Sequence, residues 1–246
     1  MDPGHAFGGV TAARLWGLPL PDPWHAAERL VIARPHGATR GSARGTRHIA
    51  YAPDLLEVGA LDGLRILGPA ATTLTLARWM PHEPLVHVVD ALLTGSDRYP
   101  DLRLPSRPHA DRGSLESFLA RCRGHNGVPA LRRALADARC GVDSRWESIT
   151  RRAIVRAGLP EPEIHPVVRL ADGRERRPDL GFTSLRIAVE FEGDGHRERR
   201  RWVSDLQRYA DFEEVDWIVV RATSVDVTGA ATPLIRRLTA AIARRA

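Results

Sequence analysis

The pattern of hydrophobic and polar positions along the chain predicts a mixed α/β protein. Short apolar runs between Gly-, Pro- and Arg-rich turns predict strands, and apolar residues at helical spacing predict helices. The predicted strands are 29–33, 48–52, 64–67, 163–170, 176–182, 186–192 and 217–220. The predicted helices are 11–17, 69–79, 84–93, 114–122, 128–140, 144–157, 196–214 and 233–245.

These elements suggest three segments. We expect residues 1–95 to form a small α+β domain and residues 96–142 to form a Pro-rich linker followed by a helical connector. We expect residues 143–246 to form a second domain, whose elements follow in the order helix, three-strand meander, helix, strand, helix. Its strand–helix–strand unit implies a right-handed parallel crossover, and therefore a mixed sheet.

The amino-acid composition limits the classes of function that the protein could have. All 36 basic residues are arginine, and the net charge of +6 permits nucleic-acid binding without establishing it. Two cysteines are too few for a disulfide framework or a four-cysteine zinc site. We see no apolar run long enough to span a bilayer and no signal peptide, so we expect a cytoplasmic protein without a membrane partner.

Acidic residues gather on one face of the predicted meander. Glu190 and Glu192 alternate with apolar residues, so both point away from the core, and Asp179 has the same parity in the preceding strand. If 183 and 184 form a two-residue turn, Asp179 lies opposite Ala188 and diagonal to Glu190. Such a carboxylate patch needs a cation or a proton. It suits Mg²⁺ or Mn²⁺ and the metal-assisted hydrolysis of phosphodiesters.

The same segment resembles a known family. Arg177-Pro178-Asp179, the later Glu190-Phe191-Glu192 and a preceding helix bearing Glu147 resemble the PD-(D/E)XK nuclease superfamily. More narrowly, the run 189–196, then Asp205 and Arg208, then the run 217–221 resemble very-short-patch-repair-type endonuclease domains of actinobacteria. The resemblance covers residues 143–225. It implies a restriction-endonuclease-like α-β-β-β-α-β core and a metal-dependent DNA endonuclease.

The resemblance also implies roles for individual residues. Asp179 and Glu190 would be metal ligands, and Glu147 would be an accessory acid. The superfamily's lysine position is Glu192, and the chain contains no lysine that could replace it. Glu192 would bind a second ion or position a water. His196 would act as a base or contact phosphate.

Arginines near this acidic face are candidates for binding DNA. Arg208 would stabilise charge on the phosphate, and Arg197 and Arg200 belong to a basic run that could track the backbone. Arg177 is a further candidate for binding DNA. The basic run is also compatible with a solvated helix face and Arg177 with a simple ion pair to Glu190. Arg208 is three residues after Asp205, a spacing that favours an intrahelical ion pair.

A structural role competes with the catalytic one at Glu147. Ser144 and Glu147 have the spacing of a capping box, in which the glutamate only bonds its own helix start. One residue can do both.

Two functions therefore remain open. The first is a metal-dependent DNA endonuclease in repair or defence, for which a homodimer is an option because many nucleases of this fold pair to cut both strands. The second is a nucleic-acid-binding regulator that keeps the fold with little or no cleavage. It is favoured by the missing lysine, whereas the three-acid face with His196 favours the first. Separately, residues 11–19 and 67–78 resemble a segment related to AbiE-type antitoxins.

Overall fold

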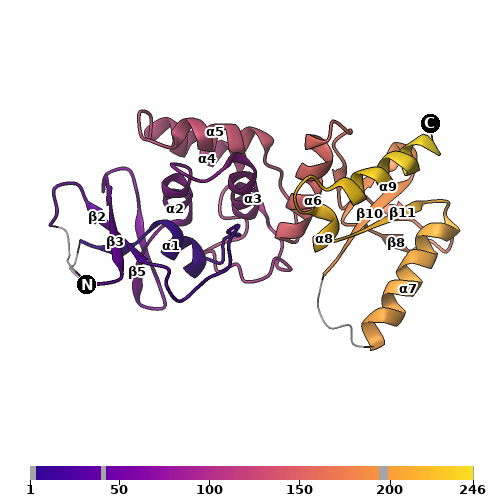
Figure 1. Cartoon of the computed structure of the whole chain (residues 1–246), viewed down its shortest axis with the longest axis horizontal. Coiled ribbons are helices and arrows are strands. Elements are labelled where there is room, and N and C mark those ends of the chain that lie inside the picture. The colour runs from indigo at the N-terminus through magenta and orange to yellow at the C-terminus, as the bar shows by residue number, and fades with distance from the viewer. Residues whose placement is uncertain (1–3, 40–42, 194–198, 246) are drawn as a thin grey trace. The chain divides into compact units, whose positions relative to one another are not determined.

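The protein is described here by a computed structural model that covers residues 4–39, 43–193 and 199–245. The chain divides into two compact units, Met1–Gly141 and Val142–Ala246. Both units mix helices and strands (Figure 1), which confirms the mixed α/β class. No helix within the described ranges combines the length and the hydropathy that crossing a bilayer requires.

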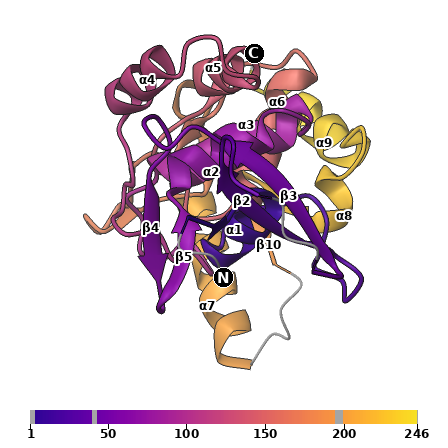
Figure 2. The same cartoon turned by 90° about the vertical axis from the view of Figure 1, so that its left-hand side faces the viewer.

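The first unit contains a five-stranded sheet in the order β3-β2-β1-β5-β4 (Figure 2). Its strands are β1 (Ala6–Phe7), β2 (Leu30–Pro35), β3 (Thr46–Tyr51), β4 (Val58–Leu61) and β5 (Leu64–Leu67). The short β1 and the hairpin partner β4 were not predicted. Strand β1 lies between β2 and β5, and Gly8 follows it where a Cβ would come within 2.8 Å of the Ala33 Cβ.

Among the described residues, five helices complete the first unit. They are α1 (Gly9–Leu15), α2 (Pro69–Leu76), α3 (His82–Leu93), α4 (Arg112–Arg121) and α5 (Val128–Asp137). Of the segment 96–142, expected as a linker and connector, residues 96–141 belong to this unit, and α5 packs against α3. The backbone N–H of Arg139 donates to the buried Asp90 carboxylate on α3 at 2.7 Å. The apolar stripe of α5 needs such a core to cover it.

The second unit is built on a four-stranded mixed sheet in the order β11-β10-β9-β6. The strands of the whole unit, including two that lie outside this sheet, are β6 (Glu163–Ile164), β7 (Val168–Arg169), β8 (Glu175–Arg176), β9 (Leu180–Phe182), β10 (Ile187–Glu192) and β11 (Ile218–Thr223). Its helices are α6 (Arg145–Arg156), α7 (Arg199–Glu214), α8 (Ser224–Val227) and α9 (Thr232–Ala243). Strands β10 and β11 are parallel and are joined through α7, as predicted.

The sheet of the second unit is covered on both faces. Ile187 and Val189 of β10 share a core with residues of α6, α8 and α9. Ala188 lies in a separate core with Phe212 of α7 and Trp217. Side chains alternate along a strand, so Glu190 shares the α7 face with Ala188.

Two predicted strands of the meander are each divided in the structure. The range 163–170 becomes β6 and β7, and 176–182 becomes β8 and β9, with β7 and β8 forming a separate two-stranded sheet. The breaks fall at Pro166 and Pro178, which cannot donate a backbone hydrogen bond to a ladder.

The predicted register between β9 and β10 was wrong by two positions. The connection is not a two-residue turn but a 3₁₀ turn, Thr183–Leu185, followed by Arg186 at φ 51°. Gly181 therefore lies opposite Ala188, and Leu180 lies opposite Val189. Asp179 comes one residue before Leu180 and thus faces Glu190 instead of Ala188.

Candidate metal centre

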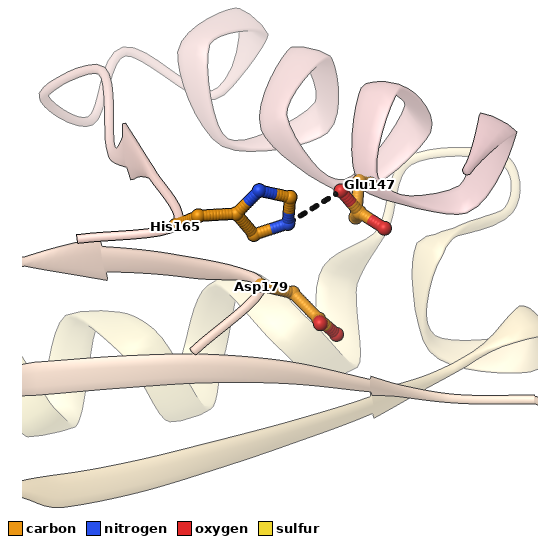
Figure 3. A group of neighbouring side chains, drawn as sticks. All are labelled: Glu147, His165 and Asp179. Atoms are coloured by element: carbon orange, nitrogen blue, oxygen red, sulfur yellow. Dashed lines mark ion pairs between the residues drawn. The ribbon is translucent and has the colours of Figure 1, made fainter. Parts of the chain in front are cut away.

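Three side chains of the second unit converge at the edge of its sheet. Glu147, His165 and Asp179 each offer one ligand atom, and these atoms all lie within 4.8 Å of one another. Figure 3 shows the three side chains approaching each other from α6, from the residue after β6 and from the residue before β9. The spacing of two carboxylates and an imidazole could hold one divalent cation.

Glu147 closes the N-terminus of α6 and also faces the site. Its backbone N–H donates to the Ser144 hydroxyl at 3.3 Å, and that hydroxyl donates to Glu147 Oε1 at 2.9 Å. Oε2 accepts from the backbone N–H of Asp143 at 2.8 Å. With 4% of its surface exposed, Glu147 is fixed from two sides. The capping role is thus present, and it holds the carboxylate toward His165.

His165 is held between the helix and the sheet. Its Nε2 lies 3.1 Å from Glu147 Oε2 and 3.9 Å from Asp143 Oδ2. Its backbone N–H donates to the Asp179 carbonyl at 3.2 Å. The hydrogen bond to Glu147 raises the pKa of His165, against the opposing effect of burial. The imidazole therefore keeps a proton at this site to a higher pH than a free histidine.

Asp179 carries a carboxyl group whose pKa is strongly raised. Its Oδ2 accepts a 2.8 Å hydrogen bond from the backbone N–H of Phe191 on β10. Burial, and then the negative charge of Glu147, raise the pKa of Asp179 to about 6. Because the neighbouring carboxylates repel, the pair is stabilised by a proton or by a cation between them.

Glu190 is held by a fork of hydrogen bonds from Arg208 on α7. Arg208 Nη2 lies 2.9 Å from Oε1 and 3.0 Å from Oε2, and its Nε lies 3.1 Å from Oε1. The same Nη2 donates to the carbonyl of Arg177 at 2.8 Å. Glu190 is only 6% exposed, so this pairing compensates much of the cost of burying its charge.

Glu192 is bound in a second polar cluster at the end of β10. Tyr209 of α7 donates its hydroxyl to Glu192 Oε1 at 2.9 Å, and Arg221 of β11 pairs with the same oxygen. The Arg221 guanidinium also stacks over the Tyr209 ring, 5.0 Å from its centroid. Burial and the bond to Glu192 raise the pKa of Tyr209 to about 12. Glu192 is thus held by a cation and a phenol.

The structure distributes the predicted site residues over two groups. Asp179 and Glu147 belong to the group that can hold a metal, whereas Glu190 and Glu192 are engaged by arginines beside it. The side chain of Arg177 is exposed. His196 and Arg197 lie outside the described residues, as does the side chain of Arg200 on α7.

His165 is not among the residues that the sequence motifs single out. A usable signal lies in the dipeptide Asp172-Gly173, which is typical of a tight turn. A tight hairpin centred there brings residues 165 and 166 opposite residue 179. The observed pairs, Val168 with Arg176 and Ile164 with Leu180, follow that symmetry.

Comparison with known proteins identifies relatives without a known function. The chain is 27% identical over 168 residues to the uncharacterized protein MT2308 of Mycobacterium tuberculosis strain CDC 1551 / Oshkosh. The identity and the matched length are the same for the uncharacterized protein Rv2248 of Mycobacterium tuberculosis strain ATCC 25618 / H37Rv. The match covers 68% of this chain and 58% of each relative, so the chain spans less than two thirds of their length.

Two further comparisons gave no match. No protein-family model matches the sequence, and no solved structure matches it.

Proposed function

We propose that the second unit is a divalent-metal-dependent DNA endonuclease with a restriction-endonuclease-like core. The observation that carries this proposal is the convergence of Glu147, His165 and Asp179 within 4.8 Å. It is supported by the element order, in which α6 precedes the meander and α7 connects β10 to β11. It is also supported by the sequence resemblance to very-short-patch-repair-type endonucleases, since Glu147 and Asp179 are residues that the resemblance marks.

The donor set suits a hard or borderline divalent ion. Carboxylates favour Mg²⁺ and Mn²⁺, whereas imidazole favours transition metals, so Mn²⁺ satisfies both preferences. The raised pKa of Asp179 fits this assignment, because a bound cation would offset the repulsion by Glu147 that contributes to the shift. When bound, the ion would neutralise charge on the phosphate and supply a more acidic water.

The protein's own residues would orient the substrate. Arg208 lies at the same sheet edge and presents a guanidinium fixed by Glu190 and by the Arg177 carbonyl. A fixed guanidinium can hold a phosphate oxygen without reorganising during the reaction. In this proposal Glu190 and Glu192 are positioning residues for Arg208 and Arg221, while Glu147, His165 and Asp179 hold the metal.

Nicking of supercoiled plasmid in Mn²⁺ and in Mg²⁺ tests the proposal. We expect the wild type to nick DNA and Asp179→Asn to be inactive. The matched control is Asp172→Asn, which removes a charge from the exposed hairpin turn and should leave nicking intact. Equal nicking by wild type and Asp179→Asn would overturn the assignment of the site.

A nucleic-acid-binding regulator with little or no cleavage is the second candidate. It is favoured by the pairing of Glu190 with Arg208 and of Glu192 with Arg221, because these arginines already neutralise two of the four acids. If this candidate is correct, DNA binds in EDTA and no plasmid is nicked in either metal. Glu190→Gln would then change only the affinity for DNA.

A further inference from the structure

The first unit contains a cavity of about 730 Å³ that lies outside the candidate metal centre. It is lined by residues of α1, β2, β3 and the end of α2, and by the turn before α5. We call it the basic cavity and define it by Arg29, Arg47, Arg78, Trp79 and His125. Its size falls in the range of small-ligand sites.

The charge of this cavity is strongly positive. Arg29, Arg47 and Arg78 are exposed, and within the described residues none of their guanidinium groups has a hydrogen bond or an ion pair. The lining contains one acid, Glu28, and Arg14 already pairs with it at 2.6 Å. The three arginines are therefore available to an anion.

The wall of the basic cavity also presents an aromatic surface. Trp79 follows α2 and is 52% exposed, which is unusual for so large an apolar side chain. Apolar residues of β2 and β3, Val31 and Ile49, line the same cavity. Gly127 lets the turn before α5 approach the end of α2, because a Cβ there would lie 2.8 Å from the Leu74 carbonyl oxygen.

We propose that the basic cavity binds an unpaired nucleotide of a nucleic-acid strand. Its phosphates would pair with Arg29, Arg47 and Arg78, and its base would stack on Trp79. Arginines beside an exposed tryptophan match the two parts of a nucleotide, since guanidinium groups bind phosphate and every base offers a π face. A base paired inside a duplex has both faces covered by its stacked neighbours, so it has no free face for the indole. This site is independent of the nuclease proposal, because it lies in the other unit.

The phosphate part of the proposal is tested by fluorescence anisotropy with a labelled single-stranded DNA oligonucleotide, using the full chain in EDTA. We expect Arg47→Ala/Arg78→Ala to bind at least about tenfold more weakly than the wild type and with a smaller salt dependence. The control Arg132→Ala/Arg133→Ala removes the same charge from the exposed side of α5 and should bind like the wild type. Equal weakening by both double variants would show a non-specific charge effect and overturn the site.

The base part is tested by an abasic version of the same oligonucleotide. We expect Trp79→Leu to weaken binding of the normal strand by at least about fivefold, as removal of one stacking partner does. The same change should leave binding of the abasic strand unaltered, and Trp79→Phe should restore part of the loss. Trp24→Leu is the control, since Trp24 is 65% exposed and does not line the cavity. An equal effect of Trp79→Leu on both strands would contradict stacking.

A free nucleotide has the same chemistry as a nucleotide within a strand. Competition by a deoxynucleoside monophosphate distinguishes the two sources. Weak competition, in the millimolar range, supports a strand that uses several phosphates. Competition as strong as that of the unlabelled oligonucleotide would overturn the proposal that the ligand is a strand and would assign the cavity to a free nucleotide. Absence of any binding by the wild type would overturn both ligands, the strand and the free nucleotide.

Discussion

Nε2 of His165 lies 3.1 Å from Oε2 of Glu147, so the carboxylate that bonds the hydroxyl of Ser144, the N-cap of α6, also pairs with a histidine at the sheet edge. The cap fixes the position of Glu147, and Glu147 in turn fixes the imidazole. Asp179 completes the group. The start of α6 and the edge of the sheet therefore meet at the candidate metal centre. A substitution at either place should have a measurable effect on the side chains at the other.

The protonation of His165 tests this relationship. Because the hydrogen bond to Glu147 is the largest cause that raises the pKa of His165, Glu147→Gln should lower this pKa. An NMR titration of the His165 ring measures it in metal-free protein. The matched control is Glu213→Gln on the exposed part of α7. An unchanged pKa in Glu147→Gln would show that another group holds the proton.

The same shift predicts a pH dependence of stability. A raised histidine pKa stabilises the folded state fully below the unfolded pKa near 6.5, and the contribution is lost as the pH rises through the folded pKa. His165→Ala should therefore cost more stability at pH 6 than at pH 9. A denaturant series at the two pH values checks this prediction, and an equal cost at both would contradict it.

Asp179 should destabilise the metal-free protein at neutral pH. Its pKa rises from 3.8 to about 6 on folding, so its cost develops between these values and is complete above the higher one. Asp179→Asn keeps an oxygen for the Phe191 N–H and removes the charge. We expect it to stabilise the metal-free protein by about 1–3 kcal/mol at pH 8.

That gain should disappear near pH 3.5, where the wild-type carboxyl is protonated as well. Urea denaturation in EDTA at the two pH values provides the measurement. A variant that is less stable than the wild type at pH 8 would contradict the shifted pKa.

Arg208 should be more important to stability than an ordinary surface arginine. Its removal leaves the buried Glu190 without its forked partner, so Arg208→Ala should destabilise the protein by about 1–3 kcal/mol. Glu190→Gln should cost less, and the two changes together should cost less than their sum. A double-mutant cycle measured by urea denaturation checks this, and strict additivity would show that the pair contributes no coupling.

Gly181 connects the packing of the sheet to the candidate metal centre. A Cβ at this position would lie 2.8 Å from Cγ of Pro166, the residue after His165. Gly181→Ala should therefore destabilise the protein by about 1–3 kcal/mol and displace the imidazole. Gly193→Ala, where no atom lies within 4 Å, is the control. Equal stability of the two variants would show that Pro166 moves aside without cost.

Much of the fold could be predicted from the sequence because periodicity is a local property. The alternation in 187–192 predicted which side chains enter the core, and α7 between two apolar runs predicted the parallel pair β10 and β11. The predicted register was wrong, because it depended on the connection after β9. That connection is a 3₁₀ turn followed by Arg186 at positive φ, and it places Gly181 instead of Asp179 opposite Ala188.

The composition of the site was harder to predict because it depends on pairings between distant elements. Asp179 and Glu147 were found from their motifs, but His165 has no motif and becomes a neighbour of Asp179 only through hairpin pairing. The partners of Glu190 and Glu192 come from α7 and β11, 17 to 29 residues further along the chain. A single sequence does not show which of several arginines fills each position.

Calorimetric titration with Mn²⁺ tests the candidate metal centre without any knowledge of the DNA substrate. We expect one Mn²⁺ bound per wild-type chain, loss of that binding in Asp179→Asn and in His165→Ala, and its retention in Asp172→Asn. Failure of the wild type to bind Mn²⁺, or equal binding by Asp179→Asn, would contradict a metal centre at Glu147, His165 and Asp179.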